Sequence, residues 1–283
     1  MIFYPIFSAV ALASGTLLQK IVLKSKKMDI KLTQVCEFLA IVLCLLPFIY
    51  FFWELNPKAF ELKNFLIFGL VILFSIIANL FTYYSVKGGK ISNLEPAKIL
   101  EPLFVILLAV LFSFFIDSHL YERNFKIIIL ALIAGTSLIF AHIKKNHLVF
   151  KKYFIAAIFG SFFFALELVI SRLILDFYSP VTFYFLRCSS IFLISLILFR
   201  PKFEKLDKPL YLKFLGLGVL WSVYRIFLYY GYLSLGILST TLVVMLAPLL
   251  IFFFAWKFLN EKINWKNILA TIVIVACILF SFL

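Results

Sequence analysis

The chain has 283 residues, of which 65% are hydrophobic and only 14% are charged. One water-soluble core could not bury that much apolar side chain, so a soluble globular protein is excluded. The net charge of +14 does not indicate a nucleic-acid partner, because the basic residues lie in short stretches between apolar runs and form no basic domain. Anionic lipid headgroups are the expected neighbours of these residues.

Apolar runs of roughly 20 residues, the length that spans a bilayer as a helix, fill nearly the whole sequence. No Lys or Arg precedes Lys20, so the first run lacks the lead-in of a signal peptide and we interpret it as a permanent span. Ten spans are predicted. In chain order they are Phe3 to Leu23, Leu32 to Trp53, Phe65 to Ser85, Pro96 to Ile116, Phe125 to Ile143, Tyr153 to Leu175, Val181 to Phe199, Leu210 to Ser234, Thr240 to Leu259 and Lys266 to Leu283.

An internal repeat relates the two halves of the chain. A shift of 146 positions aligns the third and fourth spans with the eighth and ninth, and it places Pro102 on Pro248. Because an odd number of spans per unit reverses its orientation, we expect an all-α membrane protein with ten transmembrane helices as two inverted five-helix repeats. The repeats would comprise residues 1–143 and 144–283. Such repeats place a binding site near the middle of the membrane.

The distribution of Lys and Arg among the loops predicts the orientation. Loops after odd-numbered spans hold most of these residues, and loops after even-numbered spans hold only Lys58, Lys63, Arg123, Lys126 and Arg172. By the positive-inside rule, the odd loops face the cytoplasm and both termini lie outside. We therefore expect a multi-pass protein of the cell (inner) membrane.

The cysteines and histidines indicate neither a disulfide framework nor a metal centre. All four cysteines fall inside apolar segments without paired spacing, and the three histidines lie in or beside predicted loops. A Walker-type phosphate loop is also missing from the sequence, so direct use of ATP is not expected. We therefore expect no metal and no cofactor.

Three segments resemble one transporter family. SPVTFYFLR at 179–187 resembles the second-half signature of EamA-like members of the drug/metabolite transporter superfamily. YYSVKGGKISNLEPAKILEPLF at 83–104 and LAPLLIFFFAWKFLNEKINWKNI at 246–268 resemble that family's third-to-fourth and ninth-to-tenth span hairpins. The resemblance covers essentially the whole chain and implies a transporter, not an enzyme, but it says little about the substrate.

Two departures from the family pattern suggest a specialised charged substrate. The loop from Phe115 to Tyr121, which includes Asp117 and His119, is longer than usual before the Glu122-Arg123 pair. The fourth span also carries unusual charge, with the residues Glu95, Lys98 and Glu101. The Glu122-Arg123 pair and its counterpart Glu261-Lys262 match the family pattern, and their loop positions favour a structural turn.

Ionisable side chains inside the bilayer are candidate binding residues, because each costs several kcal/mol unless it faces a cavity or a partner. Polar positions that the repeat does not match are the strongest candidates, namely Glu101, Lys98, Glu167, Arg225 and Asn79. Glu101 and Lys98 share one helix face and could bind substrate or only neutralise each other. Arg225 and Glu167 lie deep in their spans, which favours a functional role. Arg187 could bind an anion or be capped near its helix start.

Further residues have more ambiguous roles. Asn79 could simply form a hydrogen bond between helices. Six aromatic residues could line a cage for a cation, although most aromatics here only pack: Tyr83, Tyr84, Trp221, Tyr224, Tyr229 and Tyr230. Lys20 and Glu37 lie near one membrane face, where a structural pairing is expected. Pro102 and Pro248 cannot donate to the carbonyls four residues earlier, so each should kink its helix, which suits gating.

Taken together, these features indicate a secondary transporter that moves a small charged or zwitterionic metabolite, such as an amino acid or a related compound, by alternating access. If transport is coupled to protons, Glu101 or Glu167 is the expected carrier. The alternatives are an uptake carrier for a nucleoside-derived or other charged nutrient, and a flippase for a lipid-linked substrate. A lipid-active enzyme would need clustered catalytic acids or histidines at a membrane face, which the sequence lacks.

Overall fold

The computed structural model describes residues 3–23, 28–88, 97–98, 100–116, 120–121, 124–142, 152–201, 203, 208–259 and 265–282. The first half of the chain forms α1 (Phe3–Leu23), α2 (Ile30–Phe52), the short 3₁₀ helix η1 (Pro57–Phe60), α3 (Leu62–Gly88), α5 (Leu100–Phe115) and α6 (Phe125–His142). The second half forms α7 (Lys152–Ser171), the 3₁₀ helix η2 (Leu175–Phe177), α8 (Pro180–Phe199), α9 (Lys208–Leu235), α10 (Ile237–Val244), α11 (Ala247–Leu259) and α12 (Trp265–Phe282).

Six of these helices, α1, α2, α3, α7, α8 and α9, are long and apolar enough to cross a membrane by length and composition. Four shorter apolar helical segments accompany them, at Leu100–Phe115, Phe125–Ser137, Ile237–Ile251 and Ile268–Ser281. Within the described ranges no β-strand is formed beyond one isolated bridge. The prediction of a helical membrane protein is therefore confirmed.

Local sequence signals explain where several helices begin. The side chain of Asp29 accepts a hydrogen bond from the N–H of Ile30 and caps α2. Before α8, the Ser179 hydroxyl accepts from the N–H of Thr182 at 3.1 Å, and Pro180 occupies the first helical position, where its missing N–H is tolerated.

Two predicted spans differ from the observed helices. The span predicted from Thr240 to Leu259 is broken at Met245 and Leu246, where the N–H of Leu246 bonds to the carbonyl of Val243 instead of one residue earlier. Pro248 causes this break, because it has no N–H to donate and disfavours helical geometry in the residue before it. The span predicted from Tyr153 to Leu175 ends at Ser171, and the chain then turns through η2.

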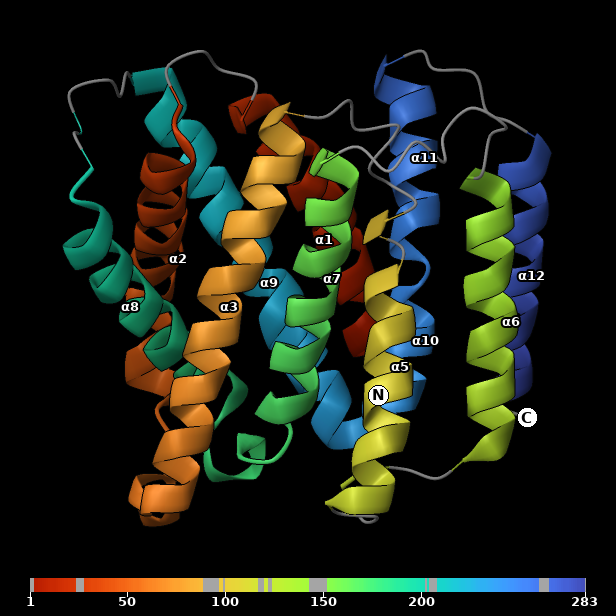
Figure 1. Cartoon of the computed structure of the whole chain (residues 1–283), viewed down its shortest axis with the longest axis horizontal. Coiled ribbons are helices and arrows are strands. Elements are labelled where there is room, and N and C mark those ends of the chain that lie inside the picture. Colours follow the sequence, from red (N-terminus) through yellow and green to blue (C-terminus); the bar gives the residue numbers. More distant parts are fainter. Residues whose placement is uncertain are drawn as a thin grey trace.

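The helices of the two halves pack against one another. α1 packs along α9 and α3 along α7, while α2 contacts both α8 and α9. α5 packs on α7, and α1 contacts α10 and α11. Figure 1 shows α6 and α12 side by side at one edge of the bundle, away from α2 and α8. Helices from both halves therefore enclose the centre of the molecule.

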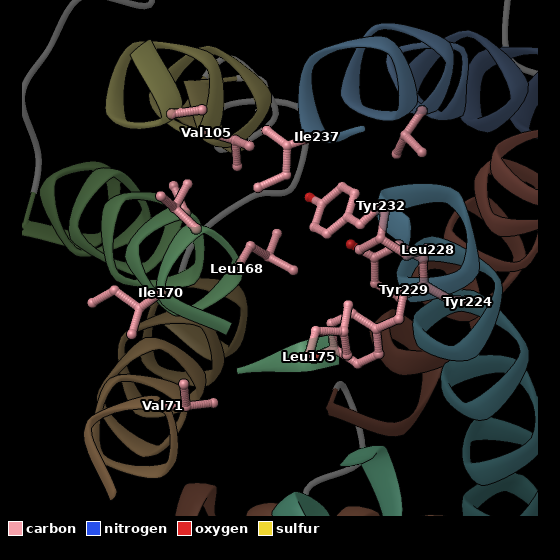
Figure 2. Close-up of a cluster of buried hydrophobic side chains, with 14 of the residues drawn as sticks. Val71, Val105, Leu168, Ile170, Leu175, Tyr224, Leu228, Tyr229, Tyr232 and Ile237 are labelled. Carbon is pink, nitrogen blue, oxygen red and sulfur yellow. The ribbon is translucent and has the colours of Figure 1, made fainter. Parts of the chain in front are cut away.

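The interior contains a continuous hydrophobic cluster. Figure 2 shows Leu168 of α7, Leu228 and Tyr232 of α9 and Ile237 of α10 facing one another at its centre. Large apolar side chains are also exposed on the outside of the bundle, including Tyr50 at 85% and Phe115 at 80%. An exposed apolar surface around a packed interior is what a lipid environment requires.

A short segment joins the two halves at the end of α2. Leu55 and Tyr178 form an isolated antiparallel bridge, and the N–H of Asn56 donates to the carbonyl of Phe177 at 2.9 Å. The Ser179 hydroxyl adds a bond of 2.5 Å to the last residue of α2. This connection, residues 52–56 against 177–182, ties α2 to the start of α8.

Replacing Gly218 by valine is expected to destabilise the packing of α9 on α2. A Cβ atom at this position would lie 2.7 Å from the backbone carbonyl carbon and oxygen of Ala40, which cannot move aside as a side chain could. Overpacking of this kind costs about 1–3 kcal/mol. Thermal unfolding in detergent measures the loss, and Gly69→Val is the matched control because a Cβ there meets nothing within 4 Å. Equal melting temperatures for the two variants would contradict the packing.

Candidate functional site

A cavity of about 180 Å³ lies between the two halves of the bundle. Residues from α1, α2, α3, α5, α7, α8, α9, α10 and α11 line it, so it draws on nearly all the helices that enclose the centre. Five charged residues are among them: Glu37, Lys98, Glu101, Arg187 and Arg225. The rest of the wall is mainly apolar and aromatic, which is typical of a small-molecule site with a few polar anchors.

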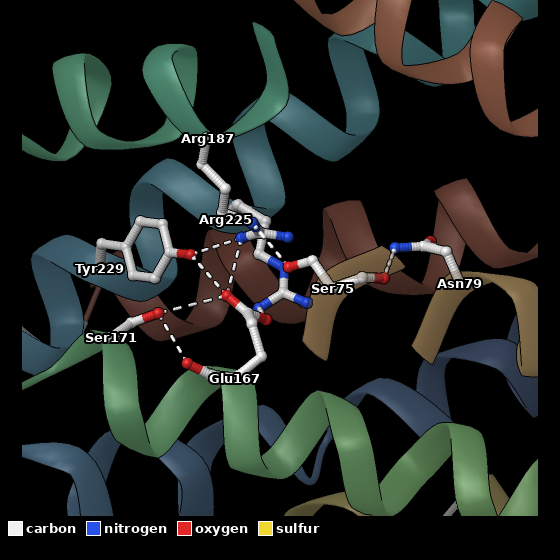
Figure 3. A network of polar contacts seen from close by, with 7 residues as sticks. All are labelled: Ser75, Asn79, Glu167, Ser171, Arg187, Arg225 and Tyr229. Atoms are coloured by element: carbon white, nitrogen blue, oxygen red, sulfur yellow. Dashed lines mark hydrogen bonds and ion pairs between the residues drawn. The ribbon is translucent and has the colours of Figure 1, made fainter. Parts of the chain in front are cut away.

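The carboxylate of Glu167 bridges two arginines behind this wall. Its Oε1 atom lies 2.9 Å from Nη1 of Arg187, and its Oε2 atom lies 3.1 Å from Nη1 of Arg225. The Tyr229 hydroxyl donates to Oε1 at 3.2 Å and accepts from Nη1 of Arg187 at 2.6 Å (Figure 3). The Ser171 hydroxyl also donates to Glu167. One acid against two guanidinium groups leaves this cluster with an excess positive charge.

Arg225 has donor capacity that its protein partners do not use. It is 5% exposed and lines the cavity, with its guanidinium 5.1 Å from the Tyr224 ring and 5.5 Å from the Phe164 ring. Its Nη1 and the Oε2 of Glu167 are close enough for an ion pair, yet neither atom has a hydrogen-bond partner within the described part of the chain. A guanidinium group in this position can bind an additional anionic group.

Arg187 forms more hydrogen bonds with other side chains than Arg225 does. In addition to Glu167 and Tyr229, its Nε donates to the Ser75 hydroxyl at 3.0 Å. Asn79 donates to the Ser75 carbonyl at 2.8 Å, so its hydrogen bond lies within α3 and does not cross between helices. Asn79 still lines the cavity. These contacts link α3, α7, α8 and α9 through one polar network (Figure 3).

Glu101 and Lys98 both line the cavity, together with Pro102. Glu101 lies in the first turn of α5, which starts at Leu100. An acid and a base from this part of the chain thus face the same space as the Arg187 and Arg225 side chains.

Glu37 is a buried residue of the cavity wall. We expected a structural pairing for it near one membrane face; it is 3% exposed and lines the cavity. Nε2 of Gln19 donates to both carboxylate oxygens, at 3.2 and 3.3 Å. Gln19 was not predicted as a site residue; the signal in the sequence was a polar side chain one turn before the end of an apolar helix.

The six aromatic residues do not form a common cage. Trp221 and Tyr224 line the cavity, with their rings 5.9 Å apart in an edge arrangement. Tyr83 is fully buried and is not among the lining residues. Tyr84 is 38% exposed beside Tyr153, Tyr230 stacks on Tyr4, and Tyr229 belongs to the Glu167 cluster. The cage is therefore reduced to two rings.

Pro102 and Pro248 line the cavity from the first turns of α5 and α11. We expected each to kink a continuous helix. Pro248 follows a two-residue interruption between α10 and α11, and Pro102 lies in α5, with residues 97 and 98 helical and position 99 outside the described residues. The interruption before Pro248 therefore lies beside the cavity wall, which leaves backbone polar groups near it.

Several sequence features lie outside the described residues. They are Glu95, the loop residues Asp117 and His119, and the pairs Glu122-Arg123 and Glu261-Lys262. The predicted boundary between the repeats, at residues 143 and 144, is also outside them.

The described residues contain no group of three or more His, Cys, Asp or Glu side chains that could hold a metal ion. The cavity wall offers two acids, Glu37 and Glu101, and three bases, Lys98, Arg187 and Arg225. This arrangement can bind groups of either sign.

Comparison with known proteins identifies the second half of the chain. Residues 151–283 match the family model described as the EamA-like transporter family. The second half of this chain belongs to the EamA-like transporter family. The resemblance to EamA-like proteins is therefore confirmed, and the EamA-like family consists of membrane transporters of the drug/metabolite superfamily, not of enzymes.

A solved crystal structure of a protein shares the fold of this chain. The two align with a TM-score of 0.69 and 16% sequence identity, over 97% of this chain and 94% of the other. The EamA-like half and the preceding half thus both take part in a known fold. No curated protein matches the sequence.

Proposed function

We propose that the protein is a secondary transporter that moves a small charged or zwitterionic metabolite through its central cavity by alternating access. The observation that carries this proposal is a cavity between the two halves, lined by side chains of both charges, of which Glu37, Arg187 and Arg225 are buried. Such side chains are costly in a bilayer and persist where they serve binding or transport.

The proposed architecture is ten transmembrane helices in two inverted repeats, residues 1–143 and 144–283. Leu62 and Lys208, the first residues of α3 and α9, are separated by the 146 positions of the sequence repeat. In this repeat α1 corresponds to α7, and α3 corresponds to α9. The packing of α1 on α9 is then equivalent to the packing of α7 on α3. The same correspondence relates α5 on α7 to α10 and α11 on α1. These paired contacts support the repeat.

The moving parts in this proposal are α5 and α11, which carry Pro102 and Pro248 in their first turns. A helix that begins or breaks beside a cavity can pivot with little loss of hydrogen bonding, because its first N–H groups have no intrahelical partner. The connection of residues 52–56 to 177–182 would close the cavity on the side of the termini. The charge of the loops supports placing that side outside the cell, in the cell (inner) membrane.

The proposed substrate is an amino acid or a related compound. Arg225 offers unused donors for a carboxylate, and Glu101 offers a carboxylate on the same cavity wall. Glu101 or Glu167 would carry the proton if transport is proton-coupled, since both are carboxyl groups in the interior.

Thermal stabilisation of the purified protein by amino acids, amines, nucleosides and phosphorylated metabolites tests this proposal, because a ligand of the folded state raises the melting temperature. We expect at least one amino acid or related zwitterion to stabilise the protein. Glu101→Ala should weaken the effect, whereas Glu61→Ala, which removes an exposed acid outside the cavity, should not. Stabilisation that survives Glu101→Ala unchanged would remove Glu101 from the site, and a response only to lipids would contradict a soluble substrate.

A further inference from the structure

Glu37 of α2 is a buried acid that the Glu167 cluster does not neutralise. It is 3% exposed and lines the cavity. The ion pairs formed among the described residues do not include it, although Lys98 is within electrostatic range. A carboxylate inside the bilayer is expected to have a cationic partner, because the desolvation cost is otherwise unpaid.

The hydrogen-bond donors around Glu37 are neutral side chains. Besides Gln19, the Tyr83 hydroxyl and the Trp221 indole N–H lie near its carboxylate. Both of these donors are buried without a hydrogen-bond partner in the described part of the chain. The Trp221 ring is held in place by α1, since a Cβ at Gly15 would lie 3.3 Å from it. A fixed aromatic ring beside a carboxylate is the chemistry that binds a protonated amine.

Trp221 lies on the same helix as Arg225, the arginine that faces the cavity. Trp221 and Arg225 are four residues apart on α9, which is about 6 Å along the helix axis, and both line the cavity. Tyr224 lies between them, with its ring 5.9 Å from Trp221 and 5.1 Å from the Arg225 guanidinium. The ring that would bind the amine and the guanidinium that would bind the carboxylate therefore come from positions about one helical turn apart on α9.

We propose that Glu37, with Trp221, is the subsite for the protonated amine of the substrate, while Arg225 binds its carboxylate. This inference rests on the proposed transport function and narrows its substrate to a compact zwitterion whose ammonium and carboxylate groups are a few bonds apart. It assigns Glu37, which the sequence favoured only as a structural partner, a direct contact with substrate.

The test uses three sets of three compounds. Each set contains an amino acid, the amine that lacks its carboxylate and the carboxylate that lacks its amine. The sets are leucine, 3-methylbutylamine and 4-methylpentanoate; phenylalanine, phenethylamine and 3-phenylpropanoate; and glycine, methylamine and acetate. Apparent Kd values come from thermal stabilisation of the purified protein. Glu37→Gln should weaken binding of the amino acids about tenfold or more and that of the carboxylates less than about twofold. Trp221→Phe, which keeps a ring but removes the N–H, should give a smaller loss confined to compounds with an amine.

Glu54→Gln is the control, because it removes an exposed acid outside the cavity. If Glu37→Gln and Glu54→Gln both bind the amino acids as the wild type does, the amine subsite is wrong while the transport proposal stands. If Glu37→Gln fails to fold, equal Trp221→Phe and wild-type affinities for the amine-bearing compounds would overturn the subsite. If the wild-type protein responds to none of the nine compounds, the proposed substrate class itself fails.

Discussion

Replacement of Glu167 by glutamine is expected to lower the melting temperature of the protein by about 10 °C. The change leaves Arg187 and Arg225, 2% and 5% exposed, without the one carboxylate that pairs with both. Removal of one partner from a buried ion pair costs about 3–5 kcal/mol, and for a chain of this length 1 kcal/mol corresponds to roughly 2–4 °C. Thermal unfolding in detergent measures the shift.

A second acid provides the matched control. Asp176 pairs with Arg172 at 2.8 Å, but its side chain is 49% exposed, so Asp176→Asn should cost less than about 1 kcal/mol. Combination of Glu167→Gln with Arg187→Gln, which leaves a single buried arginine, should recover part of the loss because the two sites are coupled. Equal shifts for Glu167→Gln and Asp176→Asn would contradict the central role of the Glu167 carboxylate.

Replacement of Arg225 by glutamine is expected to abolish transport with little loss of fold. The Glu167 carboxylate retains its ion pair with Arg187 in this variant, so no buried acid is left alone. The substrate loses the guanidinium group at the cavity, and truncation of one partner of a buried charge pair costs 2–5 kcal/mol, or about 30-fold to several thousand-fold in affinity. Apparent affinity for the stabilising ligand and uptake into proteoliposomes both report this loss.

Arg172→Gln is the control for that experiment, since Arg172 pairs only with Asp176 among the described residues and does not line the cavity. Arg225→Lys is informative as well. Lysine retains the charge but not the planar fork of donors, so we expect partial binding to return. Full affinity in Arg225→Gln would show that the substrate carboxylate binds elsewhere.

Much of the helical layout could be predicted because lipid makes hydropathy a direct signal of span length. The first predicted span, Phe3 to Leu23, coincides with α1. The break at Met245 and Leu246 was not predicted, because hydropathy does not report backbone hydrogen bonding and this segment is apolar throughout. Pro248 pointed to a disturbance of the helix, but not to the residues at which the helix is interrupted.

The cavity wall was harder to predict than the spans. Depth in the membrane singled out Glu167 and Arg225, since apolar sequence surrounds them on both sides. The direction in which a side chain points depends on which helices pack together, and the sequence does not contain that information directly. Glu37 was therefore assigned to a membrane face, while Gln19 was overlooked altogether.

Two hydroxyl groups of the Glu167 cluster were missed for a different reason, while Tyr229 was named only for an aromatic cage. Ser75 and Ser171 are of a type that occurs throughout membrane helices, so neither is distinctive alone. Their spacing was the available signal: Ser171 follows Glu167 by four residues and Asn79 follows Ser75 by four, and each pair forms the hydrogen bond that this spacing permits.

The most direct test of the central claim is uptake of a labelled amino acid that stabilises the purified protein, measured in proteoliposomes with wild-type protein, Arg225→Gln and Arg172→Gln. If the central cavity is the translocation site, wild type and Arg172→Gln should take up the label well above empty vesicles, and Arg225→Gln should not. Uptake by Arg225→Gln at the wild-type rate would contradict the claim, as would wild-type uptake no greater than that of empty vesicles.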